Sequence, residues 1–399
     1  GSEMCIRDST DTFPLELNTM PGWAGSSWYF YRYMDPTNEK EFISKESQKY
    51  WSDIDIYFGG SEHATGHLLY SRFYQKFLYD LEYLNKDEYS KKLINQGMIL
   101  GNSAFIYRES GSNQYISSNL ISNYKVDKVR IDIKYIKGDN QVNYSLLKSE
   151  DSDFKNSTFK LENDVFFCVR EQEKMSKSKF NVVNPDEICD QYGADTLRMY
   201  EMFLGPIEQS KPWDTRGISG VYSFLKKFWS LFFKDGIINV SEEEPSKESL
   251  KSLHKTIKKI TQDIEKLSLN TCISSFMICV NELSSIGCNN REILQNLLIL
   301  ISPFAPHFAE ELWSQLGHKE SIVNQIYPEY NEKYLVETEK LYPVSFNGKT
   351  RFTINLSLDL TKKQIEDAVL SFEKTKSILN NSEPKKVIVV PGKIINIVL

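Results

Sequence analysis

Two lysines and two serines within five residues are the clearest chemical signal in this sequence. Residues 174–178 read Lys-Met-Ser-Lys-Ser, which places two ammonium groups three positions apart on a polar loop. Lysine is a compact, strongly hydrated charge that binds phosphate oxygens, and such charges act most where negative charge builds up in a transition state. A lone pair of lysines is usually just a solvated surface, but the complete pattern predicts that Lys174 and Lys177 hold a polyphosphate.

A second group of polar side chains lies at residues 60–67, which read Gly-Ser-Glu-His-Ala-Thr-Gly-His. The carboxylate of Glu62 can accept two hydrogen bonds from the hydroxyls of a ribose. His63 and His67 lie four positions apart, which predicts that they share one face of a helix. A metal site is the weaker interpretation, because Glu62 would lie on a different face. We therefore predict a substrate pocket without a protein-bound metal, and ordinary packing is the remaining alternative.

A strand and a helix are predicted to position this second group. Residues 51–60 carry apolar side chains at alternate positions and end in two glycines, whereas residues 63–81 carry them at helical spacing. A strand, a glycine turn and a helix form the βα unit of a parallel sheet, which binds ligands at the carboxyl ends of its strands. Residues 59–67 lie at that end, so residues 10–100 are predicted to form an α/β domain.

The remaining segments differ from one another in pattern. Residues 174–178 are called the lysine loop below. The predicted divisions are an artefactual leader at 1–9, a polar, loosely packed β-rich insertion at 101–172, the lysine loop and its surroundings at 173–215, a helical bundle at 216–325, a linker at 326–345, and a small α/β domain at 346–399. Within the last domain, strands are expected at 351–360, 385–390 and 394–399, and a helix at 362–379. The chain is thus predicted to hold several domains of mixed α/β and α type.

Composition excludes several classes of protein. The six cysteines form no CxxC pair, which argues against zinc and disulfide frameworks and favours a reducing cytoplasm. No run of about 18 apolar residues occurs, so no membrane span is expected. Residues 1–215 hold 25 lysines and arginines against 33 aspartates and glutamates, and residues 216–399 hold 23 against 21. A net charge of −6 argues against a general nucleic-acid coat, although the second half could meet a polyanion locally.

The lysine loop matches KMSKS, the second signature of the class I aminoacyl-tRNA synthetases, whose lysines stabilise pyrophosphate during adenylation. Residues 60–67 resemble the G-x-E-H-x-x-x-H segment of the leucyl-tRNA synthetases, where it follows a strand reading D-I-Y, as residues 55–57 do here. The resemblance implies that Lys174 and Lys177 are catalytic. It also implies an ATP site formed by Gly60, Glu62, His63, Lys174, Met175, Ser176, Lys177 and Ser178.

Residues 20–30 resemble the segment that lines the leucine pocket of these synthetases. The resemblance places Trp23, Ser26 and Tyr29 against the substrate, with Tyr57 and His67 completing the wall. A leucine side chain needs a closely shaped apolar cavity, because one methylene changes binding by only about 1–3 kcal/mol. Aromatic rings supply rigid walls for such a cavity, although plain core packing is the alternative for the tryptophan.

The resemblance extends toward the C-terminus. Residues 193–198 match the Y-G-A-D-T-x-R stretch of the family, where Asp195 is expected to cap its helix or to pair with Arg198. Residues 301–313 resemble the helix pair of the anticodon-binding bundle in the Leu/Ile/Val/Met subgroup. Residues 385–399 resemble the end of bacterial leucyl-tRNA synthetases, a domain that meets the tRNA elbow and variable arm. Candidate tRNA contacts are Lys386 and Lys393, which could equally be solvated.

The resemblance implies a leucine–tRNA ligase that uses ATP with Mg²⁺, leucine and tRNA(Leu), and that is a cytoplasmic monomer when full length. The implied fold is the second half of a class I Rossmann-type catalytic domain with an insertion, then an anticodon-binding-type bundle, then a small tRNA-binding domain. The HIGH signature and the editing motifs are missing, so a fragment that is inactive alone is expected, with residues 10–100 poorly stable. The alternatives are an isoleucyl-, valyl- or methionyl-tRNA synthetase, and a non-catalytic tRNA-binding protein built from residues 216–399.

Overall fold

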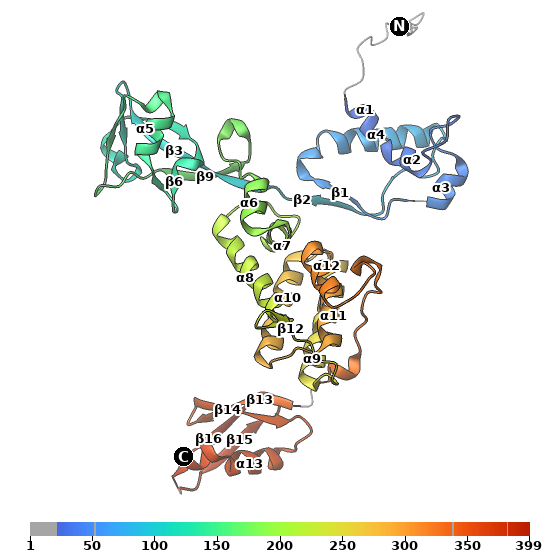
Figure 1. The fold of residues 1–399 in the computed structure, drawn as a ribbon, viewed down its shortest axis with the longest axis vertical. Coiled ribbons are helices and arrows are strands. Elements are labelled where there is room, and N and C mark those ends of the chain that lie inside the picture. Colours follow the sequence, from blue (N-terminus) through green and yellow to red (C-terminus); the bar gives the residue numbers. More distant parts are fainter. Residues whose placement is uncertain (1–21, 52, 337–338, 381) are drawn as a thin grey trace, which may run out of the picture. The chain divides into compact units, whose positions relative to one another are not determined.

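The computed structural model describes residues 22–51, 53–336, 339–380 and 382–399 (Figure 1). The leader expected at 1–9 lies outside the described residues. The chain divides into two compact units, which are described separately below. The first comprises the chain up to residue 229 with residues 262–277 and 303–308, and the second comprises residues 230–261, 278–302 and 309–399. Among the described residues, no helix combines the length and the apolar character needed to cross a bilayer.

The first compact unit contains a parallel βαβ unit, which confirms the predicted strand, turn and helix. Its elements are β1 (Tyr57–Gly60), η1 (Ser61–His63), α4 (His67–Asp80) and β2 (Leu93–Gln96). The two strands pair in parallel, with Tyr57 opposite Leu93. The strand is shorter than predicted at its start, because α3 extends to Trp51 and β1 begins only at Tyr57; the helix starts later than predicted, because the chain first makes a separate 3₁₀ turn. His63 lies in that turn, so the prediction that His63 and His67 share a helix face is wrong.

Three short helices pack beside this unit: α1 (Trp23–Ser26), α2 (Tyr29–Met34) and α3 (Lys45–Trp51). Their core is mostly aromatic. The buried residues are Phe30, Tyr31, Ile43, Leu84 and Tyr89, with Tyr57 and Trp28 packed against them. Burying aromatic rings of this size contributes strongly to stability, so this core fixes the position of β1 and of the side chains that follow it.

The insertion is a six-stranded sheet built around β3 (Ile99–Glu109). Its other strands are β4 (Gln114–Ile116), β5 (Val126–Ile131), β8 (Thr158–Lys160), β9 (Val169–Lys174) and β10 (Lys211–Pro212); β6 (Ile136–Lys137), β7 (Gln141–Val142) and α5 (Tyr144–Glu150) lie beside it in sequence. The β-rich prediction is confirmed, but the prediction of loose packing is wrong. Ile106 of β3, Leu147 of α5 and Phe166 of the segment before β9 are all fully buried in one core.

Two helices follow the lysine loop, α6 (Pro185–Tyr192) and α7 (Ala194–Phe203). The N-cap of α7 is Gly193, whose φ of 86° suits glycine. Asp195 instead accepts a hydrogen bond from the backbone nitrogen of Phe308 at 2.5 Å, and Arg198 donates to the carbonyl of Pro303 at 3.0 Å. The expected cap and the expected pair are therefore both wrong, because the two side chains bind a segment that is distant in sequence.

Helices account for the predicted bundle region. They are α8 (Ile218–Ser230), α9 (Lys247–Glu265), α10 (Leu269–Ser285), α11 (Arg291–Ile301) and α12 (Pro306–Gln315). The apolar positions that predicted them are buried, as Leu253, Ile257 and Ile260 of α9 show. Asn290 caps α11 by accepting a hydrogen bond from the backbone nitrogen of Ile293 at 3.1 Å, which satisfies one free donor of the first turn.

The C-terminal domain is a four-stranded sheet in the order β14-β13-β16-β15, with helices on one face (Figure 1). Its elements are β13 (Glu339–Phe346), β14 (Lys349–Ser357), α13 (Lys362–Ser371), α14 (Glu373–Leu379), β15 (Lys386–Val390) and β16 (Ile394–Val398). The predicted linker is wrong over 339–345, which belong to inner strand β13. Pro343 pairs with Thr353 of β14, and the pairing of β13 with β16 begins only at Val344, so the ladder with β16 needs no amide hydrogen from the proline. The predicted helix is broken at Phe372, whose backbone is extended.

Candidate functional site

A cavity of about 370 Å³ in the first compact unit brings the two predicted groups together. Gly60 and Glu62 line it from the end of β1, and Lys174 and Met175 line it from the end of β9. The remaining lining residues are Gln96, Gly97, Met98, Ile99, Glu201, Met202, Ile207 and Lys211. The sequence pattern did not single these out, because they meet the site only through tertiary contacts.

Glycines allow the walls of this cavity to approach each other. A Cβ atom on Gly97 would lie 2.1 Å from the backbone carbon of Gln209, which no structure tolerates. Gly97 also donates its backbone hydrogen to Ile207 at 2.9 Å, and the backbone nitrogen of Lys211 donates to Met98 at 2.9 Å. Residues 207–211 are thereby held against the link between β2 and β3, and together they form one wall.

Two charged side chains of this cavity are partly withdrawn from water. Burial lowers the pKa of the Lys211 ammonium. Burial also raises the pKa of the Glu201 carboxyl, and the nearby Arg198 opposes that effect. In the part of the chain that the structure describes, neither side chain makes an ion pair within 4.0 Å. A partly buried ammonium without a carboxylate partner favours an anionic ligand, because the anion offsets its lost hydration.

The lysine loop leaves β9 at Lys174 and makes a 3₁₀ turn, η5 (Lys177–Lys179). Lys174 and Met175 reach the cavity, whereas Lys177 is exposed and does not line it. Ser176 and Ser178 also stand outside the cavity, and their hydroxyl oxygens lie 3.1 Å apart. The structure therefore places one of the two predicted catalytic lysines at the cavity and the other on the exposed turn beside it.

The predicted leucine-pocket side chains are only partly brought together. The hydroxyl oxygens of Tyr29 and Tyr57 lie 3.1 Å apart, and that of Tyr57 lies 2.6 Å from Nε2 of His67. Burial, and then the charge of His63, lowers the pKa of His67, while burial raises the pKa of Tyr57. Nδ1 of His67 is buried and has no hydrogen-bond partner among the described residues. These three side chains form a connected polar and aromatic wall.

Trp23 and Ser26 lie on α1 and contribute differently. The ring of Trp23 packs over Gly66, where an added Cβ would lie 2.7 Å from it, and meets Tyr70 edge-on at 5.9 Å. The hydroxyl of Ser26 donates to the carbonyl of Trp23 at 2.9 Å. Trp23 is 49% exposed, so plain core packing does not describe it. Gly66 is the residue that lets α1 approach the start of α4.

The predicted tRNA contacts are on the C-terminal domain. Lys386 lies on β15 and Lys393 lies in the turn that leads to β16. Both side chains are exposed, and the backbone nitrogen of Lys393 donates to Val390 at 3.0 Å. Exposure suits a phosphate contact and solvation equally, so both assignments stay predictions.

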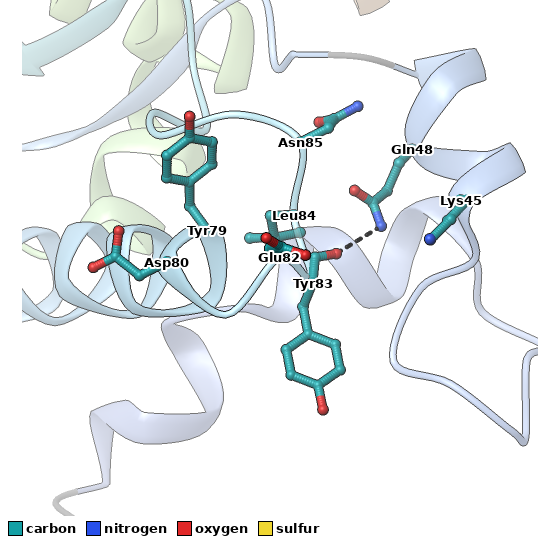
Figure 2. A pocket seen from close by; sticks show the side chains of 8 residues that line it. All are labelled: Lys45, Gln48, Tyr79, Asp80, Glu82, Tyr83, Leu84 and Asn85. Atoms are coloured by element: carbon teal, nitrogen blue, oxygen red, sulfur yellow. Dashed lines mark hydrogen bonds between the residues drawn. The ribbon is translucent and has the colours of Figure 1, made fainter.

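A second cavity of about 560 Å³ lies where α4 ends near α3 (Figure 2). The amide of Gln48 donates to the carbonyl of Tyr83 at 3.1 Å and ties the turn after α4 to α3 (Figure 2). Glu82 adopts a left-handed backbone in this turn, with φ of 59°. None of the predicted site residues lines this cavity, so it is separate from the candidate site.

Comparisons with known proteins place these features in a family. The anticodon-binding domain of tRNA ligase matches residues 246–367, and the class I tRNA synthetases (I, L, M and V) match residues 163–213. The leucine–tRNA ligase of Flavobacterium psychrophilum is 59% identical over 394 residues, which is 98% of this chain and 41% of that protein. That of Parabacteroides distasonis is 52% identical over 399 residues, which is 100% of this chain and 42% of that protein.

A solved structure is similar as well. The crystal structure of the ternary complex of Agrobacterium radiobacter K84 agnB2 LeuRS-tRNA-LeuAMS matches with a TM-score of 0.59 and 26% identity, covering 97% of this chain and 43% of that one. Fold, loop and matches define a class I aminoacyl-tRNA synthetase, with catalytic elements followed by an anticodon-binding domain. Within that class, the relatives that match over nearly the whole chain are leucine–tRNA ligases, which confirms the resemblance. It spans about 41% of the length of the Flavobacterium psychrophilum relative.

Proposed function

We propose that this chain takes part in the ATP-dependent activation of leucine and its transfer to tRNA(Leu). The supporting observation is the cavity that Glu62 and Lys174 line together, since it joins a ribose acceptor to a phosphate-binding cation. The proposal also draws on the identity of 59% to a leucine–tRNA ligase. It accounts for the isolated ammonium of Lys211, which gains an anionic neighbour when a nucleotide binds.

In the proposed reaction, the carboxylate of leucine attacks the α-phosphorus of ATP. A carboxyl oxygen–phosphorus bond forms, the bond to the bridging oxygen breaks, and pyrophosphate leaves with the electron pair. Glu62 accepts hydrogen bonds from the ribose hydroxyls, while Gly60, His63 and Met175 border the nucleotide. The ammonium groups of the lysine loop, helped by the Mg²⁺ that accompanies ATP, neutralise the charge of the leaving pyrophosphate.

The proposed amino-acid pocket is the wall formed by Tyr29, Tyr57 and His67, with Trp23 and Ser26 at its side. Rigid rings discriminate by shape, and the bonded hydroxyls fix the orientation of those rings. In the second step, a ribose hydroxyl of the terminal adenosine attacks the carbonyl carbon of the adenylate and AMP leaves. Both steps depend on positioning and charge stabilisation, without a covalent intermediate on the protein.

The tRNA is proposed to contact the helical region and the C-terminal domain. The match to an anticodon-binding domain over 246–367 supports this assignment. Lys386 and Lys393 are the proposed phosphate contacts on the small sheet, because both are exposed cations. A monomeric protein acting in the cytoplasm completes the proposal.

The test is amino-acid-dependent exchange of pyrophosphate into ATP, with leucine, isoleucine, valine and methionine in parallel. The assay uses this chain alone and mixed with the remaining part of the Flavobacterium psychrophilum relative. We expect exchange with leucine only, in the mixture. Lys174→Ala and Lys177→Ala are each expected to lower the rate about 10²- to 10³-fold. The exposed Lys155 lies in the insertion, and Lys155→Ala is the matched control.

Exchange with another of the four amino acids would show that the pocket has been misassigned. Binding of tRNA(Leu) without exchange in the mixture would favour a non-catalytic tRNA-binding protein. An equal loss of activity in the Lys155 variant would mean that removing any surface lysine disturbs the protein, and that the loop lysines have no special role.

A further inference from the structure

Two basic side chains of the insertion reach across strand β3 to carboxylates on β9. Lys128 and Arg130 lie two positions apart on β5, opposite Tyr107 and Phe105 of β3. Nζ of Lys128 lies 2.5 Å from the carboxylate of Glu171, and Nη1 of Arg130 lies 2.5 Å from that of Glu173. Each pair joins a basic side chain of β5 to a carboxylate of β9, but only the pair of Arg130 and Glu173 lies directly next to the lysine loop.

Arg130 holds Glu173 with both arms of its guanidinium. Its second nitrogen, Nη2, donates to the other oxygen of Glu173 at 3.3 Å, and Nη1 also lies 3.5 Å from the carbonyl of Lys179. Its guanidinium carbon lies 4.5 Å from the centre of the Phe105 ring. A planar fork that is paired with a carboxylate and stacked on a ring has a fixed orientation.

Glu173 passes this constraint to the backbone of the loop. Its carboxylate accepts a hydrogen bond from the hydroxyl of Ser103 at 2.5 Å, and that hydroxyl accepts one from the amide of Asn181 at 3.0 Å. The same amide group donates to the carbonyl of Lys174 at 3.3 Å, and its oxygen accepts from the backbone nitrogen of Ser176 at 3.0 Å. Asn181 is fully buried, so these bonds are shielded from water.

Close packing fixes both ends of this connection. A Cβ atom on Gly101 would lie 2.6 Å from the carbonyl oxygen of Asn181, so glycine is required where the loop returns to β3. Phe180 is left-handed, with φ of 50°, and its carbonyl accepts from the backbone nitrogen of Ile133 in the insertion at 3.1 Å. Hydrogen bonds from Arg130 and Ser103 lower the pKa of Glu173 to about 2, so the carboxylate stays charged at neutral pH.

We propose that Arg130 of the insertion is a positioning residue for the loop that carries Lys174 and Lys177. It acts through Glu173, Ser103 and Asn181, and this role rests on the proposed phosphate-binding function of the loop. The insertion is then a support of the catalytic loop as well as a separate sheet. Lys128 has the same charge, strand and kind of partner, but among the described residues its side chain contacts only Glu171 and Phe105.

Hydrogen–deuterium exchange of residues 174–182 tests the proposal, in the full 399-residue chain mixed with the remaining part of the Flavobacterium psychrophilum relative, with and without ATP and Mg²⁺. Arg130→Ala is expected to speed exchange of these amides about tenfold, because it removes a two-armed, charge-assisted contact. Arg130→Lys restores the charge, and exchange is expected to lie between that of the alanine variant and the wild type. Lys128→Ala is the matched control, with exchange expected within twofold of the wild type. Unchanged exchange in residues 216–335 shows that each variant is folded.

Loop exchange that stays within twofold of the wild type in Arg130→Ala overturns the proposal, as does equal acceleration in Lys128→Ala. If Arg130→Ala does not fold, Glu173→Gln replaces it, since this change keeps the shape and removes the charge; an unaltered loop there also overturns the proposal. Failure of the proposed function has a different signature. ATP would then leave the wild-type loop unprotected, although Arg130→Ala still loosens it.

Discussion

The change Gly97→Ala tests how the wall of the nucleotide cavity is built. The added Cβ would lie 2.1 Å from the backbone of Gln209, so residues 207–211 must move. That movement breaks the hydrogen bond from Gly97 to Ile207, at 2.9 Å, and the one from Lys211 to Met98, at 2.9 Å. At about 1 kcal/mol for each bond, plus about 1 kcal/mol of overpacking, the expected loss of stability is about 3 kcal/mol.

A loss of this size should lower the melting temperature of the first compact unit by about 6–12 °C, which scanning calorimetry can detect. ATP affinity should fall as well, because Lys211 moves with the displaced wall. The matched control is Gly59→Ala, since nothing lies within 4 Å of a Cβ atom at that position. A Gly97→Ala chain that melts within 1 °C of the wild type would refute this account of the wall.

Four further outcomes are expected. In calorimetric titration, Lys211→Ala should weaken ATP binding about tenfold, whereas Lys211→Arg should retain it. Equal ATP affinity in the two variants would show that Lys211 does not belong to the ATP site. Tyr57→Phe should lower the stability by about 1 kcal/mol, because Nε2 of His67 loses its partner at 2.6 Å. Phe166→Ala should destabilise the insertion by about 3–5 kcal/mol, since the ring is fully buried, and a loosely packed insertion would barely respond. Burial lowers the pKa of His67 in the folded chain, so the unfolded chain binds a proton at this histidine more readily. The stability of the fold should therefore decrease as the pH drops below about 6.5. Melting curves between about pH 7.5 and 5.5 can measure this dependence, which His67→Gln should flatten.

Local pattern was enough to predict the chemistry that lies within single segments. Glu62 and Lys174 stand in short motifs, and Glu62 follows a strand that its flanking residues predicted. Only the tertiary structure shows that Glu62 and Lys174 line one cavity, but the resemblance to a synthetase implied that both belong to one ATP site. The helices from residue 216 onward were predictable for a similar reason, because buried apolar side chains repeat at helical spacing.

The remainder of the site could not be predicted, because it depends on contacts between distant segments. Gly97, Glu201 and Lys211 belong to no motif; Glu201 lies on α7, and the pairing of residues 207–211 with the link before β3 brings Gly97 and Lys211 to the cavity. His63 was misplaced because the chain turns once before α4 begins. Asp195 binds a backbone nitrogen more than a hundred positions away, at Phe308, which no local rule anticipates.

The strand order of the C-terminal sheet has a consequence for the rate at which this domain folds. Strands β13 and β14 form one local hairpin, and β15 and β16 form another, so each can close quickly. The two hairpins join where residues 344–346 of β13 pair in parallel with residues 395–397 of β16, across a long loop. The entropy cost of closing the loop comes before the hydrogen bonds and contacts of that pairing stabilise the sheet, so docking of the hairpins is the slow step of folding. Until it occurs, the inner edges of β13 and β16 stay open to pairing with other chains.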